Sequence, residues 1–321
     1  MRAPFPRFAS PAAIVLFFAG LLVADPSTLT MAELLSQGRM NELISALNNR
    51  DDAESYNLLS RAYYAIEQWD TAIRNGERAV SLRPDDTNYH LWLGRQYGQK
   101  AAAALNPLVA ANYAHKAKLE FERAVKLDPS NVPARADLAE YYTQAPAVMG
   151  GGTDKARDQA AAVQKYDPAT AYWIRSIAAQ KDKRYGEAES DLKAAVGVAR
   201  NPAQYWTNLA WFYRERGRLD DMERAVQAAI AQLEKPAITY YDAANELFEG
   251  GRNYPGAVQY LKSYLASGEL VEDAPAFRAH YLLGQIYEKS GNKSAAIAEY
   301  QASLSMASGF ERARKALEQL R

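Results

Sequence analysis

The 321-residue chain contains no cysteine. Disulfides, thiolate nucleophiles, thiolate metal ligands and cysteine-linked lipid anchors are therefore excluded. Histidine is scarce, with three residues, and the 38 basic residues equal the 38 acidic ones. A balanced charge creates no overall field that would attract nucleic acid or an anionic membrane. The composition thus argues against nucleic-acid partners and leaves side-chain packing as the source of stability.

Sequence motifs of the common catalytic classes are also missing. The chain has no His-Glu-x-x-His zinc signature, no Gly-x-Ser-x-Gly elbow and no Gly-x4-Gly-Lys-Ser/Thr phosphate loop. His90 and His280 stand where a repeat described below places bulky packing residues, so we interpret both as packing rings. We therefore expect no catalytic residue, no metal site and no cofactor, and we predict that the protein is not an enzyme.

What the chain does have is an internal repeat. Residues 53–86 form a 34-residue block in which large, small and turn-forming residues follow a fixed order, namely Tyr56, Leu59, Tyr63, Ala72, Ala79 and Pro84. Six further blocks follow; the fourth is the weakest, because Trp173, Ile174 and Ile177 do not fix the register of its first helix. Large residues at helical spacing and small residues where two helices approach predict antiparallel helix pairs.

The pattern resembles the tetratricopeptide repeat family over about residues 53–305. This resemblance implies an all-α, right-handed superhelical solenoid of about seven units, with a concave groove lined by the first helices and a role in binding proteins or peptides. The alanine-rich stretch, the segment FERAVKLDPSN and the later YYTQAPAVMGGGTDKA also resemble exported bacterial tetratricopeptide proteins of undefined function.

Departures from the period mark insertions and ends. Insertions are expected near residues 98–114 and 145–154, the first as lengthened helices around Pro107. Residues 25–52 are interpreted as a degenerate helix pair turning at Gly38, and residues 306–321 as an amphipathic capping helix. Terminal repeats are expected to be atypical because one face meets solvent.

The first 24 residues differ from the rest. Arg2 and Arg7 precede an apolar run from Pro11 to Ala24, after which polar sequence begins. This arrangement predicts a secretory signal peptide, cleaved after Ala24, with an uncleaved N-terminal anchor as the alternative. We therefore expect export to a bacterial periplasm or cell envelope, with no further transmembrane segment.

Candidate partner-binding residues come from the family's geometry. Counting Ala53 as position 1, the resemblance implies that positions 2, 5, 9, 12 and 13 of each first helix face the groove. The candidates are Arg61, Tyr64, Arg95, Glu140, Trp211, Arg214, Glu246 and Tyr281. They predict a groove that is basic toward its N-terminal end and acidic toward its C-terminal end, suited to an acidic peptide; a solvated face with salt bridges between repeats is the alternative.

Two features leave alternatives open. Trp211 could be an exposed binding anchor or could cover a neighbouring helix. The loop Gly150, Gly151, Gly152 with Lys155 is either a flexible connection, with Thr153 or Asp154 capping the next helix, or an anion site made of helix N-terminal amides.

These observations predict a non-catalytic scaffold that binds a protein or peptide. The alternative is a solute-binding or transport accessory subunit whose superhelix encloses a small ligand.

Overall fold

The computed structural model describes residues 30–233 and 237–320, which form 17 α-helices and one short 3-10 helix. The predicted signal peptide and the start of the predicted N-terminal segment lie outside the described residues. Consecutive helices pack against each other as antiparallel pairs, as the repeat pattern predicts. The all-α solenoid expected from the sequence is therefore confirmed.

The helices follow the chain in this order: α1 (Met31–Ser36), α2 (Met40–Leu47), α3 (Ala53–Ala65), α4 (Trp69–Leu82), α5 (Thr87–Ala103), α6 (Pro107–Leu127), α7 (Val132–Gln144), η1 (Ala147–Met149), α8 (Thr153–Val163), α9 (Pro168–Lys181), α10 (Tyr185–Val198), α11 (Pro202–Glu215), α12 (Leu219–Ala231), α13 (Ile238–Glu249), α14 (Tyr254–Ala266), α15 (Ala276–Lys289), α16 (Lys293–Met306) and α17 (Glu311–Gln319). Among the described helices, no helix is long and apolar enough to cross a membrane.

Small residues set the distance between the helices of a pair. A Cβ atom added to Gly94 would lie 2.6 Å from the ring of Phe121, and one added to Gly284 would lie 2.4 Å from the ring of Tyr300. Both glycines stand at position 8 of a first helix, where the repeat needs a small residue so that the second helix can approach. The ring of the second helix then fills the space directly above the glycine backbone.

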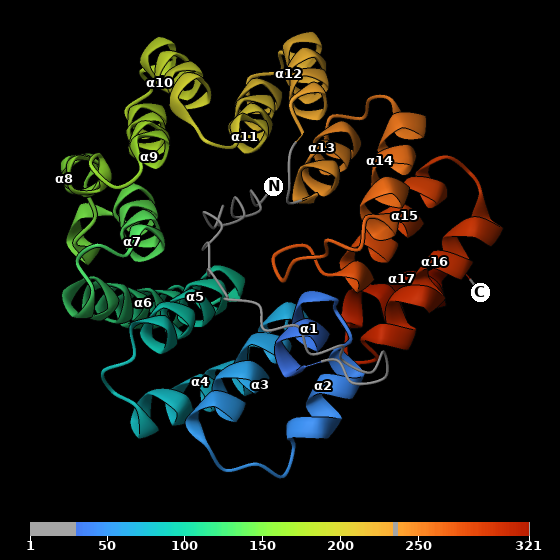
Figure 1. Cartoon of the computed structure of the whole chain (residues 1–321), viewed down its shortest axis with the longest axis horizontal. Coiled ribbons are helices and arrows are strands. Elements are labelled where there is room, and N and C mark those ends of the chain that lie inside the picture. The colour runs from blue at the N-terminus through green and yellow to red at the C-terminus, as the bar shows by residue number, and fades with distance from the viewer. Residues whose placement is uncertain (1–29, 234–236, 321) are drawn as a thin grey trace, which may run out of the picture.

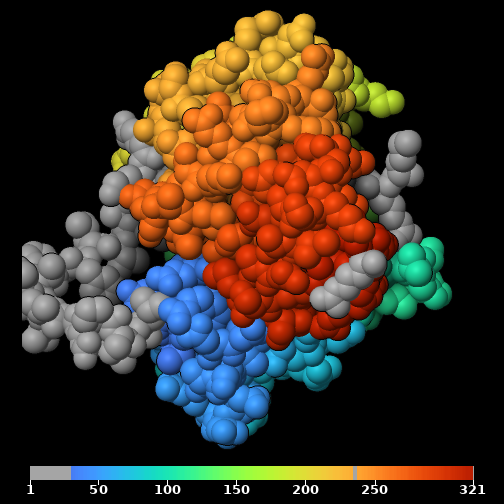
Figure 2. All heavy atoms as spheres, turned by 90° about the vertical axis from the view of Figure 1, so that its right-hand side faces the viewer, coloured from blue at the N-terminus to red at the C-terminus, as the bar shows by residue number. Residues whose placement is uncertain are grey.

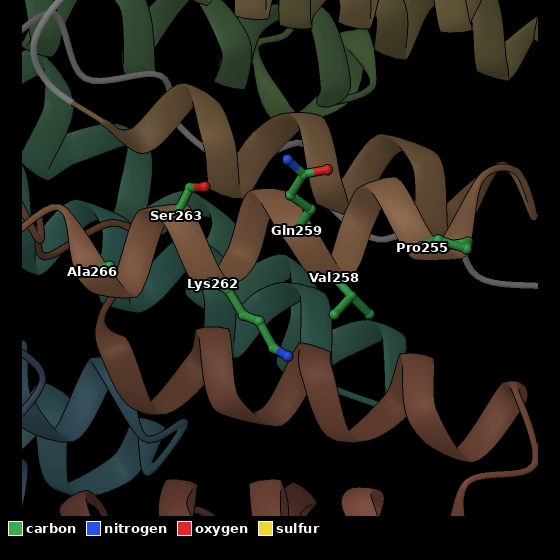
Figure 3. Close-up of a pocket in the computed structure, with 6 residues that line it drawn as sticks. All are labelled: Pro255, Val258, Gln259, Lys262, Ser263 and Ala266. Carbon is green, nitrogen blue, oxygen red and sulfur yellow. The ribbon is translucent and has the colours of Figure 1, made fainter.

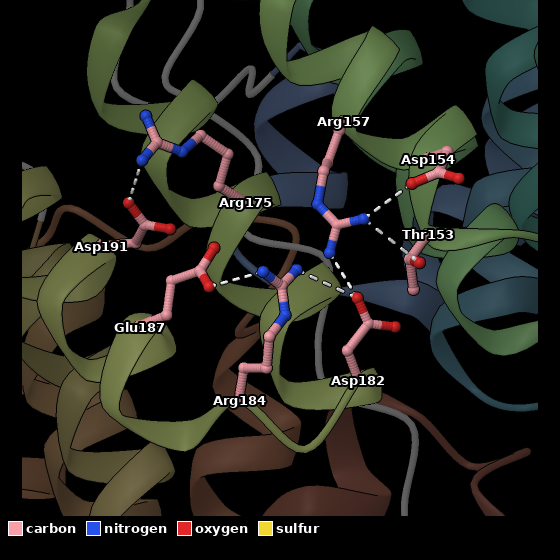
Figure 4. Close-up of polar contacts among 8 residues, drawn as sticks. All are labelled: Thr153, Asp154, Arg157, Arg175, Asp182, Arg184, Glu187 and Asp191. Carbon is pink, nitrogen blue, oxygen red and sulfur yellow. Dashed lines mark hydrogen bonds and ion pairs between the residues drawn. The ribbon is translucent and has the colours of Figure 1, made fainter.

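The fourth repeat has a polar residue where its neighbours are apolar. Five other repeats carry Leu at position 7, whereas this repeat has Arg175. The Arg175 guanidinium lies 2.7 Å from the Asp191 carboxylate on α10, so an ion pair replaces the apolar contact between the two helices (Figure 4). This substitution explains why the register of the repeat is difficult to find in the sequence.

The two ends of the array meet. The helices run once around a central axis, and α1 to α3 come to lie beside α15 to α17 (Figure 1). Figure 2 shows the N-terminal helices directly against the C-terminal ones. The expectation that the terminal repeats turn one face to solvent is therefore wrong, because each end covers the other.

A hydrophobic cluster forms this junction, which we call the seam. Its buried members come from both ends of the chain: Leu34, Leu35, Met40, Leu43, Leu47, Leu58, Leu59, Ala62, Ala65, Ile66, Phe277, Ala307, Phe310 and Ala313. The ring of Phe310 meets those of Phe277 and Tyr281 edge-on, each at 5.2 Å. Burial of this many apolar side chains makes the seam a continuation of the solenoid core.

Polar contacts fix the register of the seam. The Asn41 side chain donates to the Ser305 carbonyl at 2.9 Å and accepts from the Ser308 amide at 2.9 Å. Gly38, with φ of 78°, turns the chain between α1 and α2 and lies so close to α15 that an added Cβ would be 2.9 Å from the Ala276 nitrogen. The turn needs glycine for both reasons, the left-handed backbone and the close approach.

Candidate functional site

The inner side of the first three repeats carries a cluster of charged and aromatic side chains. Arg61 on α3 and Arg95 on α5 both lie over the indole of Trp92. The Cζ atoms of the two guanidinium groups are 4.9 and 4.8 Å from the centre of an indole ring. Tyr64 meets the same indole edge-on at 5.6 Å. Guanidinium groups stack favourably on aromatic faces, so Trp92 holds both cations in place. We call Arg61, Tyr64, Trp92 and Arg95 the arginine–tryptophan platform.

Acidic partners come from two different parts of the chain. Asp137 on α7 accepts from the Arg95 Nε at 2.6 Å, and both side chains are buried. The Arg61 guanidinium forms a bidentate pair with Glu272, with Nε to Oε1 at 2.9 Å. Glu272 lies in the loop of residues 267–275 between α14 and α15, which projects toward the centre of the ring (Figure 1). The first and the last repeats thus meet at this site.

Glu140, one helical turn after Asp137, is the least satisfied member of the cluster. Its side chain is 3% exposed; Oε1 accepts from the Gln144 side chain at 2.7 Å, but Oε2 has no hydrogen-bond partner. Burial, reinforced by the Asp137 charge, raises the pKa of Glu140 to about 8. Burial likewise raises the pKa of Asp273 to about 6. Carboxyl groups held this way respond to pH in the neutral range.

The structure brings together four of the eight predicted partner-binding residues: Arg61, Tyr64, Arg95 and Glu140. Burial raises the pKa of the Tyr64 hydroxyl to about 12. Three important members were not among the candidates: Trp92, Asp137 and the loop acid Glu272. Trp92 and Asp137 both occupy repeat position 6, which is not one of the positions predicted to face the groove.

The other four candidates lie elsewhere. Arg214 on α11 donates to Glu246 on α13 at 2.7 Å, which joins adjacent repeats. Trp211 is partly buried against the core formed by the repeats around α11 and α13. Tyr281 packs in the seam between Tyr300 and Phe310.

The arginines on which the predicted charge gradient depends are paired with acidic side chains. Arg61, Arg95 and Arg214 each have a carboxylate partner. Ring closure places Glu272, in the acidic loop between α14 and α15, against Arg61 of the first repeat. Arg95 and Arg214 fit the alternative interpretation of these positions, salt bridges between repeats, whereas the polarised groove stays a prediction.

Backbone and side-chain hydrogen bonds hold the glycine-rich segment against α7. Gly150 and Gly152 take positive φ angles, and the Gly152 amide donates to the Tyr142 carbonyl at 2.8 Å. Lys155 donates to the Gly150 carbonyl at 2.8 Å. The expected side-chain cap by Thr153 or Asp154 is wrong: the cap residue of α8 is Gly152, and no side chain caps it.

Gly151→Ala is expected to destabilise the protein by roughly 2 kcal/mol or more, because the added Cβ would meet backbone. That Cβ would lie 1.9 Å from the Ala145 carbonyl oxygen. Thermal unfolding measures the effect. Gly98→Ala is the matched control, since Gly98 is helical and a Cβ there meets nothing within 4 Å. Equal stability of both variants would contradict this account of the loop.

An ion-pair chain links α8, α9 and α10. Arg157 pairs with Asp154 at 2.9 Å and with Asp182, which also accepts from Arg184 (Figure 4). Arg184 in turn contacts Glu187 at 2.7 Å. Each cation in this chain has a carboxylate partner, so the network fixes the third repeat against the fourth.

A shallow hollow lies along α14, but its side chains do not converge. In Figure 3, Lys262 and Val258 point toward one neighbouring helix, while Gln259 and Ser263 point away from it. The lining residues are Pro255, Val258, Gln259, Lys262, Ser263 and Ala266. A ligand site needs polar groups that converge on one point, so we do not assign a function to this hollow. The residues that the structure describes include no group of three or more His, Cys, Asp or Glu side chains able to hold a metal ion.

Comparison with known proteins agrees with this architecture. A family model described as tetratricopeptide repeat matches residues 241–309. The yeast protein Tom70 is similar in structure, with a TM-score of 0.53 at 14% identity over 94% of this chain and 65% of that one. Residues 241–309 thus carry tetratricopeptide repeats, and the described helices share the tetratricopeptide solenoid fold.

Two bacterial structures have lower TM-scores. A tetratricopeptide repeat protein from Parabacteroides merdae has a TM-score of 0.43 and 17% identity over 88% of this chain and 98% of that chain. A thermophilic tetratricopeptide protein of Thermus thermophilus has a TM-score of 0.45 and 20% identity over 61% of this chain and 99% of that chain. None of the curated proteins matches the sequence.

Proposed function

We propose that the protein is a non-catalytic scaffold that binds a protein or peptide partner on the inner side of its ring. Tetratricopeptide repeats typically mediate protein–protein interactions, and this class is generally non-catalytic. The observation that carries the proposal is the arginine–tryptophan platform, because stacked arginines and tryptophan are the side chains that dominate protein recognition.

Trp211 lies outside the platform, and its predicted role as a binding anchor is tested separately. Trp211→Leu is expected to weaken partner binding at least about tenfold while the fold persists, because Trp211 is only partly buried and leucine retains much of its packing. Affinity capture with the full chain from envelope extracts, followed by titration of the purified partner, measures the loss. Trp206→Leu is the matched control on the same helix; it should lower the melting temperature but preserve binding. Equal binding by both variants and wild type would remove Trp211 from the interface.

We also propose that the protein acts in the cell envelope after export. The support is the basic start and apolar run of residues 2–24, ending in small residues. Cell fractionation with N-terminal sequencing tests this, and a mature chain starting at Asp25 is expected. Recovery of the intact chain in the cytoplasm would contradict export.

A second candidate is a subunit that encloses a small ligand. The closed ring and the buried, partly unsatisfied Glu140 favour it, since an unpaired buried carboxyl group can hold a cationic group. Native mass spectrometry of the protein purified from its source distinguishes the two functions. A bound protein supports the scaffold, whereas a bound small molecule without a protein supports the second candidate.

A further inference from the structure

The loop of residues 267–275 departs from the repeat period. Ala257 and Ala296 occupy the same repeat position yet lie 39 residues apart, five more than the 34-residue period. The five extra residues fall within the nine-residue loop Ser-Gly-Glu-Leu-Val-Glu-Asp-Ala-Pro, which carries three acidic residues and no basic one. An acidic segment thus lies at the junction whose Glu272 contacts Arg61 of the platform.

This loop is held at two places. At its base, the Tyr264 hydroxyl donates to the Ala274 carbonyl at 2.6 Å and accepts from the Val271 amide at 3.0 Å. At the centre of the ring, Glu272 holds Arg61 by a bidentate contact. Asp273 is attracted most strongly by Arg95, the other arginine of the platform. Glu272 therefore contacts one of the two arginines beside Trp92, and the charge of Asp273 interacts favourably with the other.

The contact differs from the other inner ion pairs. Arg95–Asp137 and Arg214–Glu246 join first helices of adjacent repeats, whose packing fixes both partners. Glu272 instead comes from a loop, and its side chain and that of Arg61 remain 17% and 21% exposed. A loop side chain at the edge of solvent can be replaced by an equivalent carboxylate without breaking the contact between repeats.

We propose that the arginine–tryptophan platform recognises an acidic, extended peptide segment of a partner, and that residues 267–275 occupy this site in the free protein. The inference rests on the proposed scaffold function and specifies its partner. The loop acts as an internal competitor: Glu272 satisfies Arg61 until a partner carboxylate takes its place. Bidentate pairing gives the site its selectivity for carboxylates, and Trp92 keeps both guanidinium groups oriented.

The test uses the loop itself as the probe. A fluorescein-labelled peptide of sequence SGELVEDAP is titrated by anisotropy into the full-length protein. The isosteric variant Glu272→Gln/Asp273→Asn should bind the peptide at least about tenfold more tightly than wild type. In wild type the loop occupies the site, so the apparent affinity for the peptide is reduced in proportion to the fraction of molecules whose site is free. Added salt should weaken this binding.

Two controls make the result decisive. The triple variant that also carries Arg61→Gln should return to the wild-type affinity, and the uncharged peptide SGQLVQNAP should bind no variant. Equal peptide affinity for wild type and the double variant, or no detectable binding to either, overturns the inference. Circular dichroism confirms that each variant is folded. If affinity capture retrieves a partner whose binding Arg61→Gln leaves unchanged, the scaffold function stands and the acidic-peptide site falls.

Discussion

Glu140→Gln is expected to stabilise the protein at pH 8 and to change its stability little at pH 5. The pKa of Glu140 is raised to about 8 by burial, compared with the ordinary value of 4.5. Between these two values the folded protein keeps a proton that the unfolded chain has lost, so stability falls as pH rises through this window. The loss reaches at most roughly 5 kcal/mol. Glutamine mimics the protonated acid and removes this loss.

Urea unfolding at a series of pH values measures this effect. Asp273, with its pKa raised to about 6, should still lower the stability of the variant up to about pH 6. Above pH 6 the Glu140→Gln variant should lose little further stability, whereas wild type should continue to lose stability up to about pH 8. Glu318→Gln is the surface control, because Glu318 is exposed on α17. A variant whose pH profile follows that of wild type would show that Glu140 is not held protonated.

Phe310→Ala is expected to cost about 3–5 kcal/mol of stability and to open the seam. The ring is 2% exposed and meets Phe277 and Tyr281 edge-on, so its removal leaves a cavity between the two ends of the chain. Small-angle scattering should show a larger radius of gyration. Hydrogen exchange should accelerate in α1, α2 and α17 more than elsewhere.

Phe212→Ala provides the matched control. Phe212 is 1% exposed and lies in the middle of the array, against Tyr213 at 5.7 Å. Its loss should cost a similar free energy and loosen α11 and its neighbours without separating α2 from α16. If both variants open the same helices, or if Phe310→Ala keeps the wild-type radius, the seam does not hold the ring closed.

The sequence pattern predicts the helix pairs well because each repeat is a local unit. Residues such as Leu59 and Ala72 lie within one 34-residue block, and their spacing alone determines which faces meet. The fourth repeat shows the limit of this approach, since Arg175 replaces the expected leucine and its partner Asp191 is visible only in the structure.

Ring closure could not be predicted in the same way. It depends on the small rotation between neighbouring repeats, accumulated around the whole array, and no single residue encodes that sum. The candidate site was only partly predictable for the same reason. Arg61 could be identified from its repeat position, but its partner Glu272 lies 211 residues away in the sequence. The spacing of Ala257 and Ala296 was the available signal, because it reveals an extra segment at the junction that approaches the platform.

The seam also changes how such an array should lose its structure. In an open solenoid, the terminal repeats have one neighbour each and fray first, so unfolding spreads inward from the ends. Here α2 is in contact with α16, so each terminal unit has a neighbour on both sides. Unfolding then requires a break within the circle rather than peeling from an end, which favours a more cooperative transition and slower attack by proteases at either end of the described chain.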